Sequence, residues 1–220
     1  MNEEIKSYVK SLIIPVAIIL LGIIVGRFFL IFIKNWAWIP IILFYWIVIA
    51  LLIYFDYKKN KKNPVDYFKG FRFKLSTVIL SLLVGLIPLP IFFKYFHLFD
   101  TGYLIVLWIL VAIINPLFEE IFWRGYLLDY SPKIPFWIKA IVSSLLFAVA
   151  HPLTWGIFSA NMLTVEMFIS VFTMGIVWSF VYKKSESLLL PYISHLLVDL
   201  FNCSVLAFLN LLPVMANLYK

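Results

Sequence analysis

The sequence predicts an all-α protein, a polytopic membrane bundle of about seven transmembrane helices with its N-terminus in the cytoplasm. Of the 220 residues, 64% are hydrophobic and 13% are charged. A soluble domain is about 45–50% apolar and about 25% charged, so this composition indicates a membrane protein. Several segments also reach the roughly 20 apolar residues that one span requires. Because a helix satisfies its own backbone hydrogen bonds in lipid, we expect these segments to be helical.

The predicted spans follow one another along the whole chain. The first apolar run is longer than the roughly 7–15 residues of a signal-peptide core and lacks a cleavage site, so we expect it to be retained. No repeat or soluble domain is evident, and residues 1–220 are therefore predicted to form a single transmembrane domain. Its first part, residues 1–74, would contain two spans and a basic cytoplasmic loop. The seven predicted spans are residues 12–33, 36–55, 75–93, 103–127, 137–152, 162–182 and 188–212.

The basic residues predict the orientation. With the N-terminus in the cytoplasm, 13 of the 18 basic residues lie on the cytoplasmic side, three lie outside and two lie within spans. This distribution follows the positive-inside rule. The cytoplasmic group is Lys6, Lys10, Lys58, Lys59, Lys61, Lys62, Lys69, Arg72, Lys74, Lys133, Lys139, Lys183 and Lys184, the outer group is Lys34, Lys94 and Lys220, and Arg27 and Arg124 lie within spans.

The net charge of +7 is therefore explained by lysines beside anionic lipid, and no nucleic-acid partner is expected. The lipid bilayer is therefore an expected partner. The single cysteine, Cys203, excludes a disulfide framework. The compact chain and its Lys/Asn-rich loop favour a location in the plasma membrane of a bacterium, as a multi-pass protein.

Ionisable residues within the predicted spans are the candidates for function, because each costs at least ~2.5–3.5 kcal/mol near the bilayer centre. Glu120 and Arg124 are four residues apart, so they share a helix face and are expected to pair. Glu119 points about 100° away from Glu120 and has no basic residue on its own face. Asn115, one turn earlier, can donate a hydrogen bond to it. Glu119 is therefore the carboxylate left free to act as a general base.

Two further spans each contribute a histidine. His151 ends the segment FAVAH, and His195 lies four residues before Asp199 in HLLVD. A His–Asp pair at this spacing can orient the imidazole, or both residues can approach one ion. Structural explanations remain open for each group taken alone: an interfacial ion pair, a hydrogen-bonded core histidine, and a clasp between helices.

Together the three motifs resemble those of a known family. EEIFWR fits Glu-Glu-x-x-x-Arg, FAVAH fits Phe-x-x-x-His, and HLLVD fits His-x-x-x-Asn/Asp, in that order on three spans. They resemble the CAAX-protease and bacteriocin-processing family, also called the Abi family, which consists of multi-pass intramembrane endopeptidases. The resemblance covers about residues 103–205, which would form the catalytic core, and excludes the first two spans.

The resemblance implies a role for each matching residue. Glu119 would match the glutamate that activates water, and Glu120 and Arg124 would match its supporting pair. His151 would help to hold the attacking water. His195 and Asp199 would match the pair that is placed at the developing oxyanion.

One position departs from the family pattern, because many relatives have asparagine where this chain has Asp199. An ionised carboxylate cannot donate to an oxyanion, so Asp199 must be protonated, orient His195 or bind a metal. Glu119, His151, His195 and Asp199 could form a divalent-metal site such as a zinc site, although the chain lacks His-Glu-x-x-His. Both glutamate-dependent and metal-dependent hydrolysis therefore remain open.

The function expected from the sequence is hydrolysis of a peptide bond in a membrane-associated protein or peptide. Peptide hydrolysis needs an activated water and a stabilised oxyanion, and the motifs provide candidates for both. The first alternative is a non-catalytic membrane protein, such as a bacteriocin immunity factor or a scaffold. The second is a transporter, since buried Glu and His residues also form proton relays.

Overall fold

The computed structural model describes residues 3–130 and 133–213, so Lys220 lies outside the described residues. Within these ranges the chain is helical and has no strand. The first half contains α1 (Glu3–Ser11), α2 (Ile13–Ile33), η1 (Lys34–Ala37), α3 (Trp38–Asn60), η2 (Pro64–Phe68), α4 (Leu75–Leu86), α5 (Leu89–Tyr95) and η3 (Phe96–Leu98). The second half contains α6 (Gly102–Glu120), η4 (Ile121–Tyr126), α7 (Leu127–Asp129), α8 (Phe136–Thr154), η5 (Trp155–Ile157), η6 (Ala160–Leu163), α9 (Val165–Ser185), α10 (Leu189–Phe201) and α11 (Ser204–Phe208).

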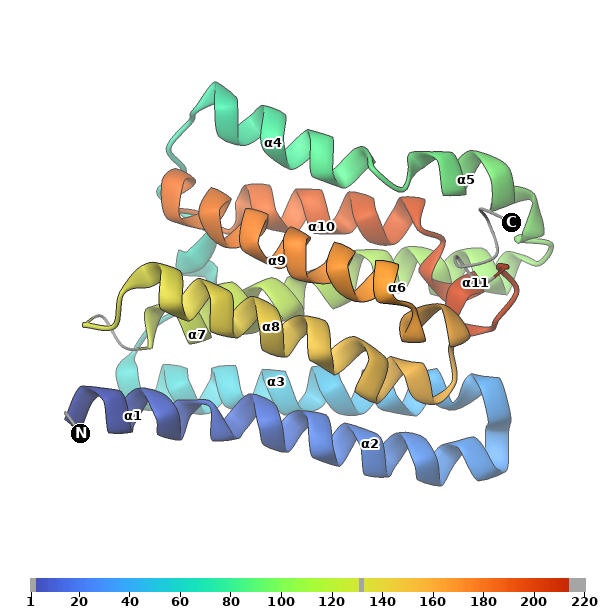
Figure 1. Cartoon of the computed structure of the whole chain (residues 1–220), viewed down its shortest axis with the longest axis horizontal. Helices are drawn as coiled ribbons and strands as arrows, with labels where there is room; N and C mark the ends of the chain where they lie inside the picture. The colour runs from blue at the N-terminus through green and yellow to red at the C-terminus, as the bar shows by residue number, and fades with distance from the viewer. Residues whose placement is uncertain (1–2, 131–132, 214–220) are drawn as a thin grey trace.

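The long helices lie roughly side by side (Figure 1). Helices α2 and α3 form an antiparallel pair at one side of the bundle, and α4 with α5 lies at the opposite side. Helix α10 packs against α4, α6 and α9, while α8 packs against α2 and α9. The helices that carry the three motifs, α6, α8 and α10, are therefore held between the outer pairs.

The predicted fold class is confirmed, since the chain is a polytopic helical bundle. Five helical segments among the described residues are long and apolar enough to cross a membrane. The first of them contains both α2 and α3, and α10 is a shorter apolar helix. Each predicted span coincides with helical residues, although two of them are broken. The third is divided into α4 and α5 at Ile87 and Pro88, and the seventh into α10 and α11 at Asn202 and Cys203. The number of spans and the orientation remain predictions.

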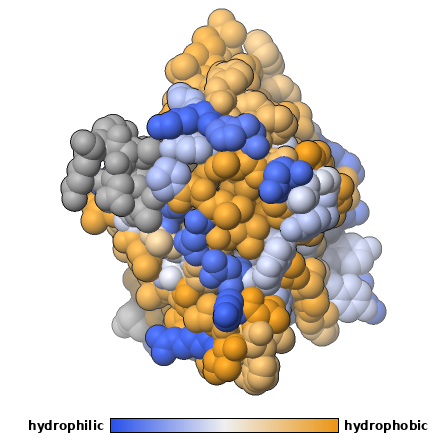
Figure 2. Space-filling view, turned by 90° about the vertical axis from the view of Figure 1, so that its right-hand side faces the viewer, coloured by the Kyte–Doolittle hydropathy of each residue, from blue (hydrophilic) through white to orange (hydrophobic). Residues whose placement is uncertain are grey.

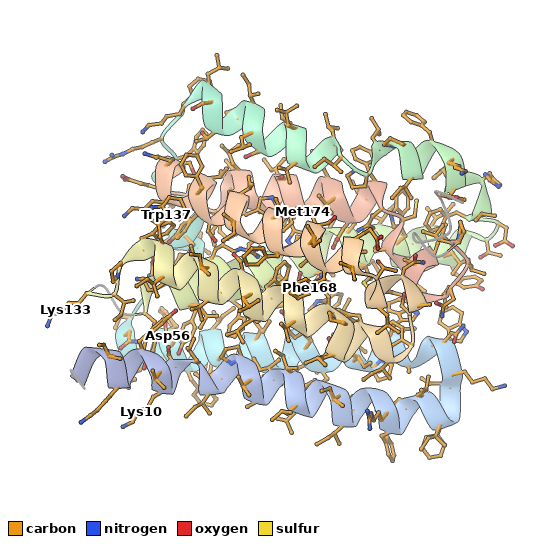
Figure 3. The ribbon with its side chains drawn as sticks, viewed as in Figure 1. Lys10, Asp56, Lys133, Trp137, Phe168 and Met174 are labelled. Atoms are coloured by element: carbon orange, nitrogen blue, oxygen red, sulfur yellow. The ribbon has the colours of Figure 1, made fainter. Side chains whose placement is uncertain are left out.

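Charged and polar side chains lie at the two ends of the bundle. Lys10, Asp56 and Lys133 lie at the end that also holds the N-terminus (Figure 3). At the opposite end, hydrophilic residues form a band with apolar surface on both sides (Figure 2). Exposed Lys34 and Lys94 belong to helices that reach this end. Polar ends joined by apolar sides are the arrangement expected for a bundle that spans a bilayer.

Small polar residues join the helices inside the bundle. The Ser194 hydroxyl on α10 donates to the Ser81 carbonyl on α4 at 2.7 Å and accepts from Trp178 Nε1 on α9 at 2.9 Å. All three side chains are buried. Such residues let helices approach closely in lipid and supply hydrogen bonds between them. The contacts of Ser194 fix α10 and therefore the position of His195, the next residue.

Candidate active site

Glu119 and Glu120 end helix α6, which continues without a break into the π-helical segment η4. Both side chains are buried, with 2% and 0% of their surface exposed. A single π-helical turn inserted into an α-helix is frequent at functional sites. Successive helical residues diverge by about 100°, and this divergence gives the two carboxylates different surroundings.

Glu120 pairs with Arg124, as the spacing predicted. The Glu120 Oε1 atom lies 3.0 Å from Arg124 Nη1, and the arginine is 1% exposed. The guanidinium also lies over the rings of Phe147 and Trp178, at 4.5 and 5.1 Å from their centroids. A charge pair inside a bundle needs such additional contacts to offset its loss of water. The pair therefore anchors η4 against α8 and α9.

His195 lies between the two glutamates. Its Nδ1 atom is 2.8 Å from Glu120 Oε1, and its Nε2 atom is 3.4 Å from Glu119 Oε2. Trp178 stacks on the imidazole, with centroids 4.3 Å apart and an interplanar angle of 19°. These contacts hold the ring in one orientation and direct Nε2 toward Glu119.

Asp199 makes a weaker contact with His195 than the sequence led us to expect. The distance from Asp199 Oδ1 to His195 Nε2 is 3.9 Å, so the close contact with the imidazole belongs to Glu120. The Asp199 carboxylate instead lies next to the side-chain amides of Asn115 and Asn202. Asn115 was expected to donate to Glu119, but its carbonyl accepts from Trp46 Nε1 at 3.2 Å and its amide faces Asp199.

His151 occupies the last part of α8, on the far side of Glu119. Its Nδ1 atom lies 2.8 Å from the Phe147 carbonyl oxygen. Because a carbonyl only accepts, Nδ1–H must donate, and the neutral ring then carries its lone pair on Nε2. That lone pair can accept a hydrogen bond from a water molecule.

Four of the six predicted site residues, Glu119, His151, His195 and Asp199, line one buried cavity of about 50 Å³. A cavity needs ~10–15 Å³ of such volume for one water, so this one can hold a few. Glu120 and Arg124 do not line the cavity. Glu120 contacts His195, which does line it, and Arg124 contacts Glu120. The cavity's polar lining residues are Asn115, Glu119, His151, His195, Asp199, Asn202 and Ser204, and its remaining lining is mostly apolar and aromatic.

A larger, mainly apolar groove of about 620 Å³ adjoins this cavity. It runs between α9 and the broken helix α4–α5, with Lys94 and Glu166 among its lining residues. It shares the lining residues Met167, Met174, Val198 and Asn202 with the cavity.

The site contains residues that the sequence did not single out. Trp178 stacks on His195, and Tyr45 from α3 lines a second cavity, of about 20 Å³, together with Glu119 and His151. Aromatic residues make up 19% of the chain, so neither position had a distinguishing signal. Only the packing of the helices identifies them.

The four candidate metal ligands line one cavity but are not grouped as ligands of one ion. Among residues 3–130 and 133–213, no group of three or more His, Cys, Asp and Glu side chains is placed to hold a metal ion. His151 and His195 both direct Nδ1 to other partners, and such contacts leave Nε2 of each ring available as a ligand. The divalent-metal site therefore stays a prediction, and we derive no catalytic step through a metal.

The fold and the site together define a class, a polytopic membrane protein with a buried cluster of glutamate and histidine side chains. Residues 101–201 match the family described as type II CAAX prenyl endopeptidase Rce1-like. This segment, which is slightly less than half of the chain, is similar to the CAAX-protease and bacteriocin-processing family, and the resemblance that the three motifs indicated is confirmed. The family is one of proteases. Searches of curated proteins and of solved structures gave no match.

Proposed function

We propose that this protein is an intramembrane endopeptidase that hydrolyses a peptide bond of a membrane-associated protein or peptide, with Glu119 as the general base. The observation that carries the proposal is the convergence of Glu119, His151 and His195 on one buried cavity large enough for water. The match of residues 101–201 to a protease family supports hydrolysis of peptides.

In the proposed reaction a water molecule lies between Glu119 and the His151 Nε2 lone pair. Glu119 takes a proton from this water, and the water oxygen attacks the carbonyl carbon of the substrate. His195 acts in its protonated form: Nδ1–H donates to Glu120, and Nε2–H donates to the oxyanion that develops. Glu119 then gives its proton to the departing amine, the C–N bond breaks, and the products are a carboxylic acid and an amine.

The neighbours of Glu119 suit these steps. Glu120 holds the imidazole of His195 through Nδ1, so Nε2 remains directed toward the cavity. Asp199, which lies 3.9 Å from Nε2 and next to two amides, helps to hold this side of the cavity and is not the oxyanion donor. The oxyanion donor is therefore the imidazole itself.

The apolar groove between α9 and α4–α5 supports a membrane-associated substrate. Its lining is mainly apolar, and it shares four lining residues with the cavity that contains Glu119. An apolar segment of a substrate bound in this groove would therefore lie next to the cavity. We propose an apolar, membrane-held peptide as the substrate class.

The test compares Glu119→Gln with the unchanged protein in liposomes. The probe is an internally quenched peptide that ends in Cys-a-a-X and is prenylated at the cysteine. Removal of a general base lowers the rate by about 10²–10⁴-fold. The matched control is Glu186→Gln, because Glu186 pairs with Arg72 at 2.8 Å on the exposed end of the bundle. Cleavage by a folded Glu119→Gln variant at the unchanged rate contradicts the proposal.

A further inference from the structure

Helix α3 lies outside the segment that matches the family, yet it contributes a side chain beside Glu119. Tyr45 is 8% exposed, and its ring meets Trp155 edge-on, with centroids 6.2 Å apart and an angle of 86°. Ile41 and Ile49, one turn away on either side, are buried as well. This face of α3 is thus fixed against the catalytic helices, and the position of the Tyr45 hydroxyl is fixed with it.

The hydrogen bonds of Tyr45 determine where its proton points. Trp123 Nε1 lies 2.8 Å from the Tyr45 hydroxyl oxygen. An indole N–H only donates, so the tyrosine oxygen must accept this bond. The phenolic proton is then directed elsewhere, and the nearby acceptor is Glu119, which lines the same small cavity and whose buried Oε2 has no hydrogen-bond partner among the described residues. The cavity of about 20 Å³ that Tyr45, Glu119 and His151 line places the three side chains together.

We propose that Tyr45 is a positioning residue, whose hydroxyl donates a hydrogen bond to Glu119, and that helix α3 thereby completes the active site. The proposal rests on the function proposed above. Glu119 is then held from two directions, by Tyr45 and by His195 Nε2 at 3.4 Å. A carboxylate fixed in this way has one orientation in which to meet the attacking water, and orientation of reacting groups contributes strongly to rate.

The experiment distinguishes this role from simple packing. Tyr45→Phe keeps the ring on Trp155 and removes only the hydroxyl. We expect kcat for the prenylated peptide to fall about tenfold or more, because small misplacements of a reacting group cost up to ~10²-fold, while KM changes less than about twofold. The acidic limb of the pH–rate profile should also move toward higher pH, since a hydrogen-bond donor favours an ionised carboxylate.

Two control variants isolate the hydroxyl. Tyr192→Phe removes a hydroxyl that donates to the Ile113 carbonyl at 3.3 Å in an exposed position, and it should leave kcat unchanged. Trp123→Phe removes the donor to Tyr45 but keeps the tyrosine proton, so we expect a smaller loss than for Tyr45→Phe. An unchanged kcat and pH profile in Tyr45→Phe overturns the proposal.

A second measurement does not depend on cleavage. Thermal unfolding in detergent of Tyr45→Phe, Glu119→Gln and the double variant forms a cycle, and interacting residues give non-additive shifts. If the unchanged protein fails to cleave any peptide but the cycle is non-additive, the proposed function fails and the Tyr45–Glu119 contact stands. Additive shifts overturn the contact whatever the activity.

Discussion

Glu120 Oε1 lies 2.8 Å from His195 Nδ1, across 75 residues of sequence, and this contact sets the direction of the imidazole. The same oxygen pairs with Arg124 at 3.0 Å. Glu120 therefore connects the charge pair within η4 and α6 to the histidine on α10. The more distant Asp199 Oδ1, at 3.9 Å from His195 Nε2, does not have this role.

The first prediction contrasts these two carboxylates. Glu120→Gln should lower kcat more than Asp199→Asn, because only Glu120 contacts His195 closely. We expect Asp199→Asn to retain activity within about tenfold, since an amide can keep most hydrogen bonds of a carboxyl group. Steady-state cleavage of the prenylated peptide by both variants is the measurement. A larger loss in Asp199→Asn than in Glu120→Gln contradicts the assignment.

The second prediction concerns the buried ion pair. Arg124→Ala leaves the buried Glu120 without its guanidinium partner, and breaking such a pair costs about 3–5 kcal/mol of unfolding free energy. The matched control is Asp129→Ala, which breaks a pair with Lys62 at 2.6 Å between side chains that are 39% and 37% exposed. An exposed pair contributes only about 0.2–1 kcal/mol. Denaturation in detergent should show this difference, and equal losses would contradict it.

The third prediction uses the close approach of α9 to Arg124. A Cβ atom at Gly175 would lie 2.9 Å from Ser144 Cβ and 3.1 Å from Arg124 Nη2. Gly175→Ala should therefore destabilise the protein by about 1–3 kcal/mol, the usual cost of overpacking. It should also lower kcat, because displaced Arg124 disturbs Glu120. Gly102→Ala is the control, since nothing lies within 4 Å of a Cβ at Gly102. The melting temperatures of both variants provide the test.

Part of this site follows from local sequence and part does not. The Glu120–Arg124 pair could be predicted because residues four apart share a helix face. The contact between Glu120 and His195 could not, because His195 has three carboxylates nearby and only the packing of α6 against α10 selects one. The stacking of Trp178 on His195 could not be predicted either, since apolar and aromatic residues occur on every helix of a membrane bundle.

The fold itself was more predictable than the site. Lipid requires helices of a known length, so the spans could be located from apolarity alone. Helix breaks were harder to locate. The chain after α10 turns at Cys203, which has a φ of 53°, and then forms the separate short helix α11. The uniform apolarity of residues 188–212 had suggested one continuous span.

The fourth prediction concerns alkaline pH at the loop between α3 and α4. Burial lowers the pKa of Lys62, but hydrogen bonds to Asp129 and Tyr67 outweigh it and raise the pKa above 10.5. Burial also raises the pKa of Tyr67 above 10.0. In both cases the folded state binds the proton more tightly than the unfolded state. Their contribution to stability is therefore complete below about pH 10 and is lost as the pH rises through the folded pKa values.

Melting temperatures measured from about pH 8 to about pH 11 test this window. The double variant Lys62→Met with Tyr67→Phe should lose less stability over this range than the unchanged protein. Lys58→Met with Tyr54→Phe is the control, because Lys58 lies 5.3 Å from the Tyr54 ring on an exposed part of α3. A steeper alkaline loss in the first double variant contradicts the prediction.

The fifth prediction separates the two chemistries that the motifs allow. The candidate ligands Glu119, His151, His195 and Asp199 are not grouped as ligands of one ion, whereas Glu119 and His151 can hold water by themselves. Cleavage should therefore survive dialysis against a strong chelator, with metal content measured in the same sample. In a metal-dependent enzyme the ion activates the water, so its removal abolishes activity and its return restores it. Loss of cleavage on chelation that zinc reverses would contradict a glutamate-only mechanism, and Asp199→Asn would then be expected to weaken zinc binding.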